Sequence, residues 1–199
     1  VIAASLLLSF YLSGCAVVTA VSAIPGALYS SVAGQFSSIE VSFPHSMRAS
    51  LAAAQHSLQS MRLDIDLLEI QEGGGYGIAF NNEKLNGKMI LVKQTERLTT
   101  VSIRVKSMMR EESIEHAIIQ LMETTLEKSP SVARFEIEAY QNLRAQPTEQ
   151  SKHLGWFRPG ALLDARKSPK SGWLKVELPS GDDAYLKGNI TSTDIVQYQ

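Results

Sequence analysis

Side chains able to bind a metal ion are few and poorly spaced in this sequence. The chain contains four histidines, and none has a partner at a spacing typical of metal ligands. Glu112 and His116 share one face of a helix, but a single pair supplies too few ligands for a metal ion. The only cysteine excludes a disulfide framework and a cysteine-built metal centre. The sequence therefore predicts no metal site and no metal cofactor.

Residues suited to acid–base or nucleophilic catalysis do not form a recognisable site either. Asp64 and Asp66 share a strand face and could act as paired acids. They alternate with Leu63 and Ile65, so we interpret them as the solvent-facing side of a strand. The glycine-rich run 73–77 lacks the lysine and hydroxyl residue of a phosphate-binding loop, and is interpreted as a hairpin connection. The sequence predicts no catalytic residue, and thus a protein that is not an enzyme.

Cations interleaved with aromatic residues are the best candidate for ligand binding. Between residues 158 and 175 the basic side chains are accompanied by a single acid, Asp164. Such a surface could bind an acidic partner, or stack on a sugar or a peptide. The alternative is that Trp173 belongs to the core and the cations are solvated loop residues. The predicted ligand-binding residues are Trp156, Arg158, Arg166, Lys167 and Lys170.

The cysteine has its own chemical context near the beginning of the sequence. An uncharged apolar run, residues 2–12, leads into Leu12-Ser13-Gly14-Cys15, which resembles the lipobox of bacterial lipoproteins. In that family the thiol receives diacylglycerol, the leader is cut before the cysteine, and the new amine is acylated. The resemblance implies a signal peptide over residues 1–14, acyl chains on Cys15, and no other cofactor. No basic segment precedes the run, so we expect the sequence to begin within the signal peptide.

The residue after the cysteine bears on localisation. It is Ala16 and not aspartate, which by resemblance to enteric sorting rules implies the periplasmic face of the outer membrane. One alternative is a transmembrane anchor, because residues 1–24 carry no charge and are long enough to span a bilayer. The second half of that segment is weakly apolar and ends at Pro25-Gly26. The other alternative is that Cys15 is a buried structural cysteine.

Composition sets further limits on the rest of the chain. The 199 residues are 44% hydrophobic, enough for one or two small domains with a core. Of the 19 basic and 20 acidic residues, only Glu40 lies among the first 43. The remaining chain is electrically neutral, which argues against nucleic acid as a partner.

Hydrophobic spacing predicts the elements that must position these residues. Residues 15–43 are interpreted as a lipidated tether that includes an early strand over 38–43. An apolar face predicts a helix over 45–61, and a second helix is expected over 112–127. Between them, alternation predicts strands that begin near Leu63, Tyr76, Lys88 and Val101, with hairpin turns at Asn86-Gly87 and Glu96-Arg97. Residues 44–128 are therefore predicted to pack two helices against one antiparallel sheet.

This order of elements resembles a family of bacterial lipoproteins, the DUF3568 type. Its members run from a lipobox through a tether of small residues into helix, strands and helix. The nearest matching stretch is 99–105. Because no activity is assigned to that family, the resemblance implies no functional residue.

The C-terminal part resembles a bacterial SH3 (SH3b) domain. The resemblance rests on Asn142–Pro147, Leu154-Gly155, Pro159-Gly160, Gly172–Val176 and Gly181 to Leu186. It departs from the family pattern at Asp183-Ala184 and in a short insertion, 168–171. Short strands with glycine and proline turns are typical of a small barrel. We expect Leu143, Trp173, Val176 and Leu186 to supply most of its core.

The predicted fold class is thus α+β: a helix–antiparallel sheet–helix domain over 44–128, followed by a small all-β SH3-like barrel over 134–199. The predicted function is a non-catalytic binding or scaffold module at the outer membrane, acting through the SH3-like domain. Its expected partners are an envelope protein or a peptidoglycan peptide, with assembly into an oligomer. One version is a subunit of an envelope-spanning secretion or motility machine. The alternatives are a peptidoglycan-binding accessory or targeting protein of a hydrolase, and a membrane-surface sensor or stress lipoprotein.

Overall fold

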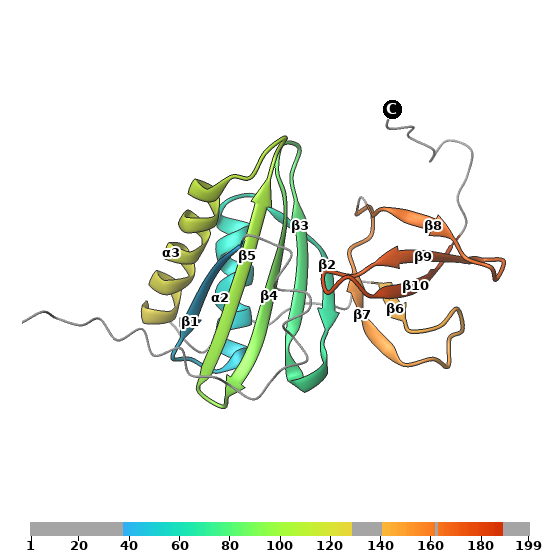
Figure 1. Cartoon of the computed structure of the whole chain (residues 1–199), viewed down its shortest axis with the longest axis horizontal. Coiled ribbons are helices and arrows are strands. Elements are labelled where there is room, and N and C mark those ends of the chain that lie inside the picture. Colours follow the sequence, from blue (N-terminus) through green and yellow to red (C-terminus); the bar gives the residue numbers. More distant parts are fainter. Residues whose placement is uncertain (1–37, 129–140, 162, 189–199) are drawn as a thin grey trace, which may run out of the picture.

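The computed structural model describes residues 38–128, 141–161 and 163–188. The described residues form one ten-stranded antiparallel sheet and two α-helices, with strand order β1-β5-β4-β3-β2-β7-β6-β10-β9-β8. Figure 1 shows both helices on one side of the first five strands in this order, with the other five beyond β2. The helices are α2 (Met47–Ser60) and α3 (Glu112–Lys128), and the first strands are β1 (Ile39–Phe43), β2 (Asp64–Ile70), β3 (Tyr76–Asn81), β4 (Asn86–Thr95) and β5 (Leu98–Lys106).

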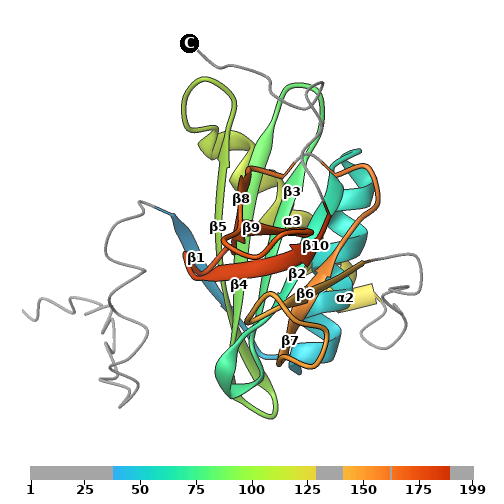
Figure 2. The same ribbon diagram turned by 90° about the vertical axis from the view of Figure 1, so that its right-hand side faces the viewer.

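The second half of the sheet consists of shorter strands. Figure 2 shows β9 and β10 running across the direction of β4 and β5. A single 3₁₀ turn, η1 (Glu72–Gly74), connects β2 to β3. The short strands are β6 (Gln141–Arg144), β7 (His153–Phe157), β8 (Ala165–Lys167), β9 (Trp173–Glu177) and β10 (Asp183–Lys187).

The two predicted helices are confirmed to within two residues at each end. Ser46 caps α2, because its hydroxyl oxygen accepts a hydrogen bond from the Ala49 N–H at 3.3 Å. Helix α3 begins with Glu112 and Glu115 in its first turn and ends with Lys128, as the helix dipole favours. The early strand over 38–43 is also confirmed, as β1, which pairs with β5.

The first hydrophobic core lies between the helices and the sheet. Alternate residues of β1 to β5 point toward α2 and α3, so each of these five strands contributes one face to this core. Its fully buried members include Leu58, Ile78, Phe80, Met89, Leu91, Val101, Ile103, Val105, Ile118 and Met122.

A second, smaller core lies on the opposite face of β2. Leu68 belongs to the first core and its neighbour Leu67 to the second, because successive side chains of a strand point to opposite faces. The other buried members of the second core are Leu143, Phe157, Val176, Leu178, Ala184 and Leu186. Trp173 is buried at 9% exposure but does not belong to this cluster.

The predicted fold class is wrong, because the C-terminal strands do not form a separate closed barrel. Strand β7 pairs antiparallel with β2, with Leu67 opposite Phe157 and Glu69 opposite Gly155. The described strands therefore continue the first sheet, which ends at β1 and β8 and does not close. The physical reason is the free edge of β2, whose backbone N–H and C=O groups would otherwise lack strand partners.

One predicted hairpin turn is wrong and the other is confirmed. Asn86-Gly87 begins β4, and the turn lies just before it, where Asn82 Oδ1 accepts from the N–H groups of Lys84 and Leu85. Gly87 lies opposite Phe80, and a Cβ there would sit 2.3 Å from Phe80 Cζ. The glycine makes room for the ring. The Glu96-Arg97 turn joins β4 to β5 as expected.

The predicted signal peptide, Cys15 and most of the tether lie outside the described residues. Lipidation and the transmembrane alternative therefore both stay predictions. Within 38–128, 141–161 and 163–188, neither helix has the length and apolar character needed to cross a bilayer.

The pairing of β7 with β2 depends on a glycine. A Cβ added to Gly155 would lie 2.1 Å from the Leu68 carbonyl oxygen and 3.0 Å from Glu69 Cα. We expect Gly155→Ala to lower the free energy of unfolding by about 3 kcal/mol or more, because the two strands must separate. Urea denaturation followed by circular dichroism measures this loss.

The control is Gly160→Ala. Both glycines have a positive φ, 155° at Gly155 and 76° at Gly160, but no atom lies within 4 Å of a Cβ added to Gly160. We expect this control to lower the free energy of unfolding by about 1 kcal/mol, because alanine is less stable than glycine at a positive φ. Equal losses in the two variants would contradict a close contact between β7 and β2.

Candidate functional site

A buried ion pair joins β2 to the end of β7. The Asp66 side chain is 4% exposed, and its Oδ1 accepts from Arg158 Nη2 at 2.6 Å. The Arg158 N–H also donates to the Asp66 carbonyl at 2.7 Å, and the side-chain amide of Asn81 donates to Asp66 Oδ2. Burial raises the pKa of Asp66 above its usual value, and the bonded Arg158 guanidinium opposes that rise.

The prediction that Asp64 and Asp66 both face solvent is right for Asp64 only. The Asp64 side chain is 68% exposed, and its Oδ2 lies 3.8 Å from Arg158 Nη2. The pairing of β2 with β3 shifts register between Ile65 and Leu67, which breaks the simple alternation at Asp66. Arg158 and Asn81 then bond to this carboxylate.

A second buried carboxylate, Glu69, holds the β9–β10 turn against the sheet. Its Oε2 accepts from the Ser180 N–H at 2.9 Å, and Gln71 adds a side-chain hydrogen bond. Gly77 on β3 leaves the space for this contact, because a Cβ there would lie 2.6 Å from Glu69 Oε2 and 3.0 Å from Pro179 Cβ. Burial raises the pKa of Glu69 as well.

These two carboxylates join the two halves of the sheet. Each bonds to groups from the other half of the sheet, and so ties the two halves together. A pocket of about 40 Å³ beside η1, between Gln71 and Lys93, is far smaller than a small-molecule site. Among the described residues, no three His, Cys, Asp or Glu side chains gather as metal ligands would.

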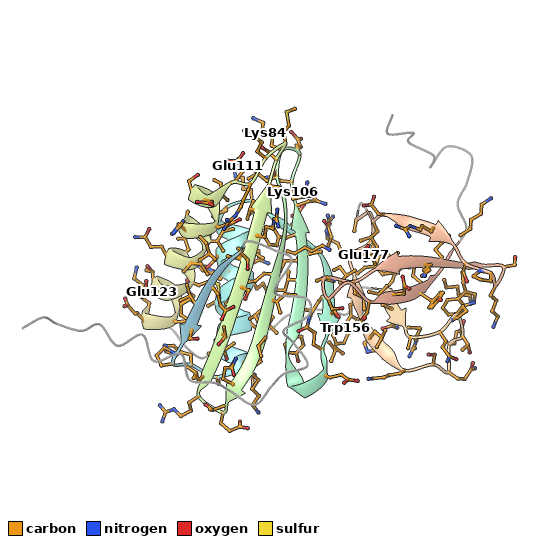
Figure 3. The ribbon with its side chains drawn as sticks, in the orientation of Figure 1. Lys84, Lys106, Glu111, Glu123, Trp156 and Glu177 are labelled. Carbon is orange, nitrogen blue, oxygen red and sulfur yellow. The ribbon has the colours of Figure 1, made fainter. Side chains whose placement is uncertain are left out.

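The structure divides the five predicted ligand-binding residues into two groups. Trp156 is half-buried against the first core. Its ring meets the His153 ring edge-on, with the two ring centroids 4.5 Å apart. Figure 3 shows Trp156 where β2 and β7 meet, and Arg158 is bonded to Asp66 at that same junction. Arg166 and Lys167 lie on β8, and Lys170 lies in the turn before β9. The last three side chains are exposed.

Register places Arg166 in a line of polar side chains across four strands. Arg166 is opposite Lys175, Lys175 is opposite Tyr185, and Tyr185 is opposite Arg144. We call these four residues the cross-strand row. Their chain neighbours Val176, Ala184 and Leu143 belong to the second core, so the row faces the other side of the sheet.

The charges within the cross-strand row are only partly balanced. Arg166 and Lys175 are directly opposite, an arrangement of like charges that destabilises a strand pair. A hydrogen bond from Lys175 Nζ to Asp183 Oδ2 at 2.7 Å raises the pKa of Lys175, and the charge of Arg166 opposes that rise. The side chains of Arg166, Lys167 and Lys170 form no ion pair with any described residue.

Sequence reasoning missed Tyr185 and Arg144 as members of this surface. Both follow a core residue in their strand, so alternation could have placed them on the outer face. Their alignment with Lys175 required the strand order, which local patterns do not supply. Trp173 is buried, which agrees with the alternative that it belongs to the core.

Comparisons with known proteins add no assignment to this geometry. No protein-family model matches the chain, and no curated protein matches it. The resemblances to bacterial lipoproteins, to the DUF3568 type and to SH3b sequences therefore stay predictions.

The Asp66–Arg158 pair can be tested by removing one partner. We expect Arg158→Met to lower the free energy of unfolding by about 2–3 kcal/mol, because it leaves a buried carboxylate uncompensated. Asp64→Asn removes only an exposed partner at 3.8 Å and should change stability by less than about 0.5 kcal/mol. Urea denaturation at neutral pH compares the two variants. Similar small losses in both would show that the pair is not buried in solution.

Proposed function

We propose that this protein is a lipid-anchored, non-catalytic binding protein at the periplasmic face of the bacterial outer membrane. Its partner is an acidic, extended segment of another envelope protein. The partner is held by the cross-strand row together with Lys167 and Lys170. A subunit role in an envelope-spanning secretion or motility machine, within an oligomeric assembly, is the specific form of this proposal.

The observation that carries the proposal is the pair of like charges at Arg166 and Lys175. Like charges directly opposite each other on neighbouring strands, as Arg166 and Lys175 are here, destabilise the strand pair and are usually avoided. Asp183 compensates Lys175, while the exposed Arg166 makes no ion pair with a described residue. A carboxylate from a partner would bond Arg166 and relieve the repulsion. Tyr185, half-buried beside Lys175, offers an aromatic surface in the same line.

The position of β8 supports an extended partner. It is the last strand of the described sheet, and no other described strand pairs with its outer edge. Such an edge can hydrogen-bond to a peptide strand, while neighbouring side chains supply specificity. Arg166 and Lys167 lie on this edge strand, and Lys170 lies in the turn that follows it. A segment with acidic residues at successive positions would bond to the backbone of this edge and meet Arg166 on one face and Lys167 on the other.

The binding surface is tested by charge reversal. We expect Arg166→Glu with Lys170→Glu to reduce partner crosslinking by about tenfold, because two contacts to carboxylates become repulsive. The measurement is in vivo crosslinking of the full-length protein, followed by mass spectrometry and quantification of each adduct.

The matched control is Lys84→Glu with Lys128→Glu, which changes net charge equally but at exposed positions away from β8. Circular dichroism should show both double variants folded, since none of the four side chains is buried. Unchanged crosslinking by the Arg166/Lys170 variant would contradict this surface. Adducts to peptidoglycan instead of protein would favour the cell-wall accessory function.

The anchor is tested separately by Cys15→Ala. We expect the variant to lack acyl chains and to keep its leader, because the thiol is the acyl acceptor and acylation precedes cleavage in lipoproteins. Cell fractionation and intact-mass measurement of the natural precursor and product check both outcomes. A variant that is still processed and membrane-bound, or a native product with an unmodified thiol, would contradict lipidation.

A further inference from the structure

Two adjacent methionines stand out on the surface of the described chain. Met108 is 99% exposed and Met109 is 78% exposed, in the loop that joins β5 to α3. Single exposed apolar residues are common on protein surfaces, but two large ones side by side at a loop tip leave a concentrated apolar area in water. Both thioethers are more exposed than any other large hydrophobic side chain in the described ranges.

Backbone hydrogen bonds give this loop a defined shape. The Ser107 N–H donates to the Met109 carbonyl at 2.9 Å, and the Glu111 N–H donates to the Val105 carbonyl at 2.9 Å. The Ser107 hydroxyl also donates to Glu111 Oε1 at 2.7 Å. The loop is therefore closed at its base, and its tip projects beyond the end of β5.

A buried charge network fixes the loop from beneath. Glu115 is fully buried, and its Oε1 accepts from the Val105 N–H at 2.9 Å. Arg110 reaches Glu115 Oε2 through Nη2 at 2.6 Å, and Glu112 Oε1 through Nη1 at 2.8 Å. Breaking a buried pair of this kind is costly. The network holds the main chain on both sides of Met108 and Met109, so their exposure follows from a specified conformation.

The loop lies at the end of the sheet where the chain enters from its N-terminal side. Strand β1 runs antiparallel to β5 with Ile39 opposite Ile103, so β1 begins near the end of β5 that leads into the loop. Figure 3 shows Lys84, Lys106 and Glu111 at this same end. Residues 16–38 lie between Cys15 and β1, and can span roughly 80 Å when extended. An anchor at Cys15 therefore permits this end of the sheet to meet the membrane.

Charges around the tip are of both signs. Exposed Lys84 and Lys106 are accompanied by Glu83 and Glu111, while Arg110 is bonded to acids. A net positive patch would indicate attraction to anionic headgroups. The mixed charge here favours contact through the apolar side chains, without a preference for anionic lipid.

We propose that the loop 107–110 is a membrane-contact element whose Met108 and Met109 side chains enter the interface of the membrane that holds Cys15. This inference rests on the lipid anchor proposed above. It assigns an orientation to the anchored protein, with the β5–α3 loop against the bilayer. The flexible, unbranched methionine side chain suits an irregular lipid surface.

The test uses the full-length lipidated protein with an environment-sensitive fluorophore on Met108→Cys. Acylation consumes the Cys15 thiol, so the label attaches to the introduced cysteine. In phosphatidylcholine vesicles that contain nitroxide-labelled lipid, we expect quenching at position 108 to be roughly threefold or more that of the same label on Glu123→Cys. Glu123 is exposed on α3, away from the loop. Adding phosphatidylglycerol to the vesicles should leave the ratio unchanged.

A second pair of variants controls for the label. The fluorophore is placed on Lys84→Cys, at the same end of the sheet, in proteins with and without the two substitutions Met108→Ser and Met109→Ser. When both serines are present, we expect lipid quenching to fall to the level measured with the label on Glu123→Cys. These two exposed substitutions remove apolar surface without touching the core.

Each outcome separates this inference from the proposed anchor. Equal quenching at positions 108 and 123 in vesicle-bound, acylated protein would overturn the membrane contact and leave the anchor standing. Crosslinking of position 108 to a protein or to a second copy, in place of lipid quenching, would also overturn it. If intact-mass measurement shows a free Cys15 thiol and the protein does not remain with the vesicles, the anchor itself is wrong and the inference falls with it.

Discussion

Strand β2 has two hydrogen-bonding edges and two faces, and the structure uses all four. One edge pairs with β3 and the other with β7. Leu68 enters the core under the helices, while Leu67 enters the core of the C-terminal strands. A shift of β2 by one residue would send each leucine to the wrong face, so both cores specify the same register. The rest of the sheet is positioned by this one strand.

The two buried carboxylates on β2 add specificity to that arrangement. Apolar packing tolerates sliding, whereas Asp66 must meet Arg158 and Glu69 must meet the Ser180 N–H. Burial raises the pKa of both acids, because the charged form of each carboxylate loses its hydration in the interior. We interpret them as devices that fix where the C-terminal strands join the sheet. The exposed contact between Lys88 on β4 and Glu177 on β9, at 3.5 Å, contributes little by comparison.

Local patterns in the sequence predicted elements well and their assembly poorly. Local cues such as hydrophobic spacing located both helices, because those cues lie within a few residues of each other. The pairing of β2 with β7 was missed, since Asp66 and Arg158 are 92 positions apart and alternation does not name a partner strand. The same limit applies to the site. The proximity of Arg166 and Lys170 was visible in the sequence, but Tyr185 joins them only through cross-strand register.

A continuous sheet has a mechanical consequence for the two proposed contacts. The membrane-contact loop follows β5, and the cross-strand row extends outward to β8, at the far end of the strand order. Two domains on a free linker would let a partner move relative to the bilayer. Here, hydrogen-bonded strands connect the two surfaces through the β2–β7 junction. The glycine contact at Gly155 and the buried acids Asp66 and Glu69 therefore fix the orientation of the cross-strand row relative to the β5–α3 loop.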